Sequence, residues 1–139
     1  MAPAVRSALV QLGSAAVEAG IEKELLELVK LRASQINGCA FCLQFHLNLA
    51  RGLDVPPEKL DLVAAWRDAG VYSARECAAL AWTELLTCIA QEHISDEDYA
   101  AAREHFSEKE LVFLTAAIGA INSWNRLAVA FRFVPPART

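Results

Sequence analysis

The sequence lacks the features of a membrane-spanning or nucleic-acid-binding chain. None of its apolar runs approaches the ~20 residues that a membrane-spanning helix needs. It also has no excess of positive charge, because 13 Lys and Arg residues face 17 Asp and Glu residues, for a net charge of −4. A nucleic acid or an anionic membrane would call for a basic patch that releases counterions. We therefore expect neither kind of partner.

Targeting signals and disulfide frameworks are also missing. The Ala-rich N-terminus has no compact apolar core of a signal peptide, since Gln11, Gly13 and Ser14 interrupt it. With 139 residues and only four cysteines, the chain is large enough to fold without disulfides or a metal. We expect one cytoplasmic domain over residues 1–139.

Strand patterns are scarce, and helical spacing of apolar residues takes their place. Over 22–36 the apolar positions cover most of the helix circumference, which predicts a helix buried on most sides. Three S-x-x-E/D capping boxes predict helix starts after Ser73, Ser95 and Ser107. The sequence thus predicts an all-α bundle of six or seven helices, over 4–19, 22–36, 38–51, a segment from Pro57 to Gly70, 74–90, 96–106 and 108–133.

The segment QINGCAFCLQFH, residues 35–46, carries the chemistry. Cys39, Cys42 and His46 follow each other at helical spacing, so they share one face of the expected helix 38–51. A disulfide across one helical turn is mildly strained and easily reduced, which suits a redox cycle. With Asn37 as the expected N-cap, the helix N-terminus would favour a thiolate at these cysteines.

Other interpretations of the two thiols remain. Cys39, Cys42 and His46 could be part of a zinc site, although zinc normally needs a fourth ligand. The cysteines could also simply pack in a core, as free cysteines often do. A thioredoxin-like motif would require a βαβ setting, which this chain does not suggest. Cys77 and Cys88, eleven residues apart on an apolar stripe, look structural.

The stretch ELVKLRASQINGCAFCLQFH resembles the alkylhydroperoxidase D-like, carboxymuconolactone decarboxylase family. The later segments AAWRDAGVYSARECAALAWTELLT and HFSEKELVFLTAAIGAINSWNRLAVAFR support the resemblance, which covers about residues 20–133. It is similar to the single-domain branch that keeps C-x-x-C. The resemblance implies an all-α bundle that assembles into trimers or hexamers and reduces organic hydroperoxides.

The resemblance also implies roles for single residues. Cys42 corresponds to the cysteine that attacks the peroxide, Cys39 to the resolving cysteine, and His46 and Glu27 to a proton relay. Glu27 lies in the narrow polar stripe of helix 22–36, and Glu24 is its competitor. Phe41 departs from alkylhydroperoxidase D, which has a histidine just before the second cysteine.

We therefore expect a thiol-dependent peroxidase in which an external dithiol reduces the Cys39–Cys42 disulfide, with no cofactor and no metal. The alternatives are a disulfide reductase or redox sensor, a zinc-binding or oligomeric module, and a decarboxylase-like protein, which the intact dithiol disfavours. The high apolar content, 55% of residues, independently favours a homo-oligomer.

Overall fold

The computed structural model describes all residues from 1 to 139 and is entirely helical. Eight α-helices and one 3₁₀ helix follow each other without strands. Their bounds are α1 Pro3–Glu18, α2 Lys23–Asn37, α3 Ala40–Gly52, α4 Pro57–Asp61, η1 Val63–Ala65, α5 Trp66–Ala69, α6 Ala74–Thr87, α7 Asp96–Arg103 and α8 Glu108–Ala130. None of them is long and apolar enough to cross a membrane.

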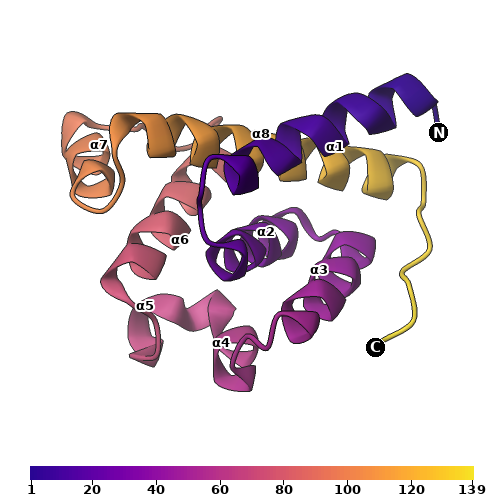
Figure 1. Cartoon of the computed structure of the whole chain (residues 1–139), viewed down its shortest axis with the longest axis horizontal. Helices are drawn as coiled ribbons and strands as arrows, with labels where there is room; N and C mark the ends of the chain where they lie inside the picture. Colours follow the sequence, from indigo (N-terminus) through magenta and orange to yellow (C-terminus); the bar gives the residue numbers. More distant parts are fainter.

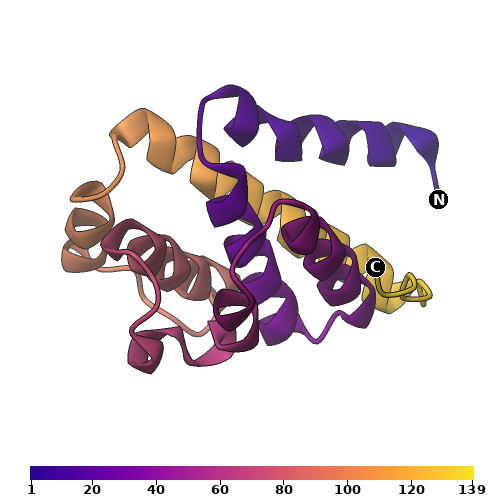
Figure 2. The same cartoon turned by 60° about the horizontal axis from the view of Figure 1, so that its bottom comes forward.

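The central helix is α2, which packs against α3, α6 and α8 (Figure 1). Its predicted burial on most sides is confirmed, because eight of its 15 residues are buried. Helix α1 packs against α8 along one edge of the molecule in Figure 1, and the turned view of Figure 2 shows that the two helices diverge toward the N-terminus. Helices α2 and α3 contact each other and both contact α8, so they lie side by side below the α1–α8 pair in Figure 1.

The predicted capping boxes are also confirmed. Ser73, Ser95 and Ser107 each accept a hydrogen bond from the backbone N–H three residues later, and the acidic side chain there bonds back to the serine N–H. Each box satisfies two backbone donors that the first turn leaves free. These boxes fix the starts of α6, α7 and α8.

The expectation of six or seven helices is wrong, because the segment from Pro57 to Gly70 is divided into α4, η1 and α5. The backbone leaves helical geometry at Leu62 and Ala65, with φ of −106° and −116°. In the 3₁₀ turn between them, residues three apart lie on the same side. Val63 and Trp66 are thereby both buried against α2 and α6.

Candidate active site

The connection between α2 and α3 places the two cysteines. Gly38 ends α2 in the left-handed conformation, with φ 65° and ψ 35°, which glycine adopts at little cost. Cys39 is then the N-cap of α3, and its Sγ accepts a hydrogen bond from the backbone N–H of Cys42 at 3.2 Å. The expectation that Asn37 caps this helix is wrong, because the cap lies two residues later and is a sulfur.

Both sulfurs of the dithiol are buried and unbonded to each other. Cys39 is 1% exposed and Cys42 is 3% exposed, and each is a free thiol. They pack with Ile121 and Ala128 of α8. Cys77 and Cys88 lie on α6 and at its end, apart from this cluster. No group of three or more His, Cys, Asp or Glu side chains is arranged to hold a metal ion.

The electrostatics of Cys42 differ from the expected thiolate. Burial raises the pKa of the Cys42 thiol to about 12, and the neighbouring Cys39 adds to the rise. The backbone N–H of Cys42 is hydrogen-bonded to the Cys39 sulfur. At neutral pH Cys42 is therefore a thiol, and its reaction as a nucleophile requires a base.

His46 and Glu27 form a buried pair close to the dithiol. His46 Nδ1 lies 2.7 Å from Glu27 Oε2, a hydrogen bond between α3 and α2. Glu27 Oε1 also lies 3.8 Å from Lys30 Nζ. A carboxylate bonded to one ring nitrogen orients the imidazole and directs the other nitrogen elsewhere. Glu24, the competitor at the start of α2, is exposed and has no contact with His46.

A network of amide side chains ties the dithiol to α8. Asn37 Nδ2 donates to Asn122 Oδ1 and to Asn125 Oδ1, both at 2.9 Å. Asn125 Nδ2 donates to Ser34 Oγ at 3.1 Å. Asn125 also lowers the pKa of the Cys42 thiol, opposing the effect of burial.

Asn125 is the residue that the sequence analysis missed. An amide nitrogen has two hydrogens, so the bond from Nδ2 to Ser34 leaves one hydrogen available to another acceptor. Asn125 is 1% exposed and lies between Ile121 and Ala128 on the face of α8 that meets the cysteines. A signal was present, since two asparagines three residues apart interrupt an apolar helix, but the partner 88 residues away could not be inferred.

A cavity of about 610 Å³ opens beside the dithiol, bounded by α1, α3 and α8. Cys42 and His46 both line it, so the reactive sulfur and the imidazole face one space. Phe41, which stands where alkylhydroperoxidase D has a histidine, stacks with Phe45 at 5.9 Å between ring centroids and meets Phe133 edge-on at 5.3 Å. Most of the wall is apolar, including Leu9, Val10, Phe41, Phe45, Ile121 and Trp124.

The four residues selected from the sequence thus lie in one α2–α3 unit. Glu27 contacts His46, and the Cys39 sulfur accepts a hydrogen bond from the backbone N–H of Cys42. Cys42 and His46 share the cavity wall. The arrangement has the parts that a thiol nucleophile requires: a sulfur, a second sulfur one turn away, an imidazole and a carboxylate that orients it.

Comparison with known proteins gives a consistent result. The model of the carboxymuconolactone decarboxylase family matches residues 3–85. The uncharacterized protein YdfG of Bacillus subtilis (strain 168) is 39% identical over 113 residues, which are 81% of this chain and 77% of that protein.

Solved structures are similar over nearly the whole chain. A protein of unknown function from Agrobacterium tumefaciens, proposed to be the antioxidant defence protein AhpD, is 39% identical, with a TM-score of 0.92 over 99% of this chain and 94% of that one. An uncharacterized peroxidase-related protein with an alkylhydroperoxidase AhpD core, from Ralstonia eutropha JMP134, is 23% identical, with a TM-score of 0.82 over 96% and 72% of the two chains. The likeness to the Ralstonia eutropha protein, at 23% identity, shows the fold alone.

Proposed function

Because the chain belongs to the carboxymuconolactone decarboxylase family and has an AhpD-like fold, we propose that it is a thiol-dependent peroxidase that reduces organic hydroperoxides. The observation that carries the proposal is the buried Glu27–His46 pair beside Cys42, whose thiol opens onto an apolar cavity. The Agrobacterium tumefaciens neighbour, which is 39% identical and proposed to be the antioxidant defence protein AhpD, supports the same reaction class.

The first step is the attack on the peroxide. Glu27 holds the imidazole of His46 through Nδ1, and the other ring nitrogen takes the proton of the Cys42 thiol as the sulfur attacks. The sulfur bonds to one peroxide oxygen, the O–O bond breaks, and the alkoxide leaves as the alcohol with that proton. Cys42 is then a sulfenic acid. Because burial keeps the thiol protonated at rest, His46 acts during the attack.

The second step closes the disulfide. The Cys39 sulfur attacks the Cys42 sulfur, and the sulfenic hydroxyl leaves with one proton as water. An external dithiol then reduces the disulfide by thiol–disulfide exchange and is itself oxidised. The overall change is one hydroperoxide and one external dithiol to one alcohol, one water and one external disulfide.

The decisive experiment measures hydroperoxide consumption with a dithiol donor. We expect turnover by the wild type, none by Cys42→Ser, and about one equivalent consumed by Cys39→Ser, which stalls at the sulfenic acid. Peptide mapping after mild oxidation should find Cys39 linked to Cys42, with Cys77 and Cys88 as thiols. Turnover by Cys42→Ser, or a principal Cys77–Cys88 bridge, would refute the proposal.

A disulfide reductase or redox sensor would use the same residues without efficient peroxide turnover. Phe41 is the observation that favours this second candidate, because alkylhydroperoxidase D has a proton-transferring histidine at that position. Rapid reduction of a disulfide substrate together with slow hydroperoxide consumption would identify it.

A further inference from the structure

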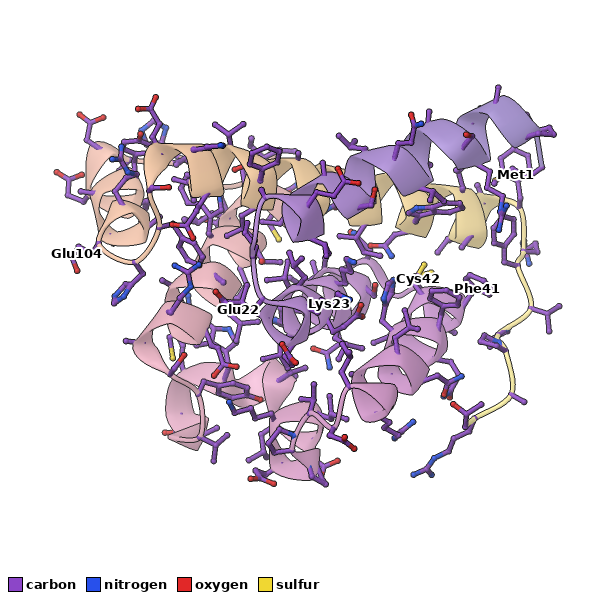
Figure 3. The ribbon with its side chains drawn as sticks, in the orientation of Figure 1. Met1, Glu22, Lys23, Phe41, Cys42 and Glu104 are labelled. Atoms are coloured by element: carbon purple, nitrogen blue, oxygen red, sulfur yellow. The ribbon has the colours of Figure 1, made fainter.

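The roof of the cavity is one face of α1. Arg6, Val10, Gly13 and Val17 line the cavity and are spaced three or four residues apart, so they form a single stripe on this helix. The 11 steps from Arg6 to Val17 correspond to about 16 Å along the helix axis. In Figure 3, α1 passes over α3 near Phe41 and Cys42 and continues to Met1 at its outer end. The cavity therefore has an extended, mostly apolar roof with a cation at Arg6.

The charge around the cavity is opposite in sign to that of the whole chain. The protein carries a net charge of −4, yet no Asp or Glu side chain lines this cavity. Its two cationic side chains are Arg6 and Lys30. Lys30 lies 3.8 Å from the Glu27 carboxylate, so its charge is compensated. Arg6 is exposed and forms no salt bridge or side-chain hydrogen bond, so its guanidinium is free to bind an anion.

We propose that the cavity selects organic hydroperoxides that carry a carboxylate at the end of an apolar chain, and that Arg6 binds this carboxylate. The inference rests on the proposed peroxidase function. A guanidinium binds a carboxylate through two parallel hydrogen bonds, which gives orientation as well as attraction. The apolar walls contact the chain, as in most small-molecule sites. The hydroperoxyl group then faces Cys42 and His46, and the carboxylate leaves the reaction unchanged on the product alcohol.

A neutral, compact hydroperoxide is the poorer fit to these observations. It would leave the free Arg6 guanidinium without a role and would fill only part of a cavity of about 610 Å³. A dithiol reductant with its own carboxylate could use the same cation, and the kinetics below separate that occupant from the hydroperoxide.

The test compares linoleic acid hydroperoxide, its methyl ester and cumene hydroperoxide, all below the concentration at which micelles form. The variants are Arg6→Gln and, as a matched control, Arg126→Gln. Arg126 is an exposed arginine of α8 that lines a neighbouring groove with Ala4 and Ala8, away from Cys42. We expect Arg6→Gln to raise KM for the acid about tenfold, which corresponds to one lost charge-assisted contact. KM for the ester and for cumene hydroperoxide should stay constant, and Arg126→Gln should change none of the three.

Three results would overturn the proposal. An equal change for acid and ester would mean that Arg6 shapes the cavity without binding the carboxylate. A change in the KM for the dithiol alone would mean that Arg6 binds the reductant and not the hydroperoxide. A changed molecular mass of Arg6→Gln in light scattering would assign it to a subunit contact.

Binding can be measured without turnover. Calorimetry with the hydroxy acid product and its methyl ester should show tighter binding of the acid to the wild type and loss of that preference in Arg6→Gln. If this preference is found but no hydroperoxide is consumed, the anion site stands and the peroxidase proposal fails. If hydroperoxides are consumed but acid and ester bind equally, the peroxidase stands and the Arg6 site fails.

Discussion

His46 Nδ1 lies 2.7 Å from Oε2 of Glu27, and both side chains are buried although 19 residues separate them in the chain. The carboxylate fixes the ring in one orientation and stabilises the imidazolium that forms when His46 accepts a proton. A purely structural pair would affect stability, whereas a relay also affects the rate of the peroxide step.

We predict that His46→Ala slows the reaction of Cys42 with hydroperoxide by about 10²–10⁴-fold, the usual contribution of a general base. Glu27→Gln should act in the same direction with a smaller effect, because it removes the charge that favours the imidazolium. Stopped-flow measurement of sulfenic acid formation checks both. Glu24→Gln is the control, since Glu24 starts the same helix but is exposed. If Glu24→Gln slowed the peroxide step and Glu27→Gln left its rate unchanged, the assignment of the relay carboxylate to Glu27 would be wrong.

Asn125 gives a second prediction. Asn125→Ala removes the amide group that opposes the raised pKa of Cys42, so the peroxide step should slow about tenfold. Asn122→Ala is the matched control, because Asn122 also accepts from Asn37 at 2.9 Å but does not lower the pKa of Cys42. Both variants should lose about 1–3 kcal/mol of unfolding free energy. Equal rates for the two variants would limit Asn125 to a structural role.

The cap of α3 can be tested without any peroxide. Serine is a preferred N-cap and alanine is not, so Cys39→Ala should be less stable than Cys39→Ser by about 1 kcal/mol. Urea unfolding under reducing conditions measures the difference. Identical stabilities would mean that the hydrogen bond from the Cys42 N–H to Cys39 Sγ contributes nothing to the start of the helix.

The raised pKa of Cys42 predicts a pH dependence of stability. The folded state holds this proton up to about pH 12, whereas an ordinary cysteine loses it near pH 9. The folded state thus binds more protons between these values, and the unfolding free energy should fall as pH rises from 9 to 12. Below pH 9 this contribution is fully present. Urea titrations of wild type and Cys42→Ala across this range measure it.

Tyr72 is a confounder in that experiment, because burial also raises its pKa to about 12. Its contribution has the same sign, so the comparison should be repeated in a Tyr72→Phe background. In Tyr72→Phe, the unfolding free energy should still fall between pH 9 and 12. In the double variant with Cys42→Ala, this fall should be smaller. A loss that does not depend on Cys42 would contradict the prediction.

The exposed apolar surface predicts self-association. The single chain exposes 7714 Å², compared with about 7,100 Å² for a typical folded monomer of its mass. Val5, Val10 and Leu12 of α1 and Val112 and Val129 of α8 are each more than 40% exposed. Light scattering after size exclusion should give three or six times 15.2 kDa. A mass near 15 kDa at micromolar concentration, with native helicity, would contradict this.

Local signals in the sequence predicted the helices well where capping dominated. The starts of α6, α7 and α8 follow from serine and an acidic residue three positions later, and the structure has them at those positions. The break between α4 and α5 was missed because it depends on tertiary packing. Trp66 is buried and donates from Nε1 to Glu84 on α6, an interaction that no local pattern reveals.

The same division holds for the site. Helical spacing alone places Cys39, Cys42 and His46 on one face, and the family resemblance adds Glu27. The cap at Cys39 was assigned to Asn37, because asparagine is the stronger capping residue in general. In the structure the Asn37 amide is engaged by α8, which leaves the cap to a sulfur. Contacts between residues more than 80 positions apart in the sequence therefore determined which residue caps α3.

The short connection at Gly38 and Cys39 also constrains how this site could be copied into another protein. Seven residues lead from the cap at Cys39 to His46, close to two full helical turns, so the imidazole stands above the cap on the same line of α3. One residue inserted between them would turn His46 by about 100° around the axis, away from Glu27. A designer who grafts only C-x-x-C onto a helix would therefore obtain a dithiol without its base. The transferable unit is the α2–α3 pair with its chain lengths intact.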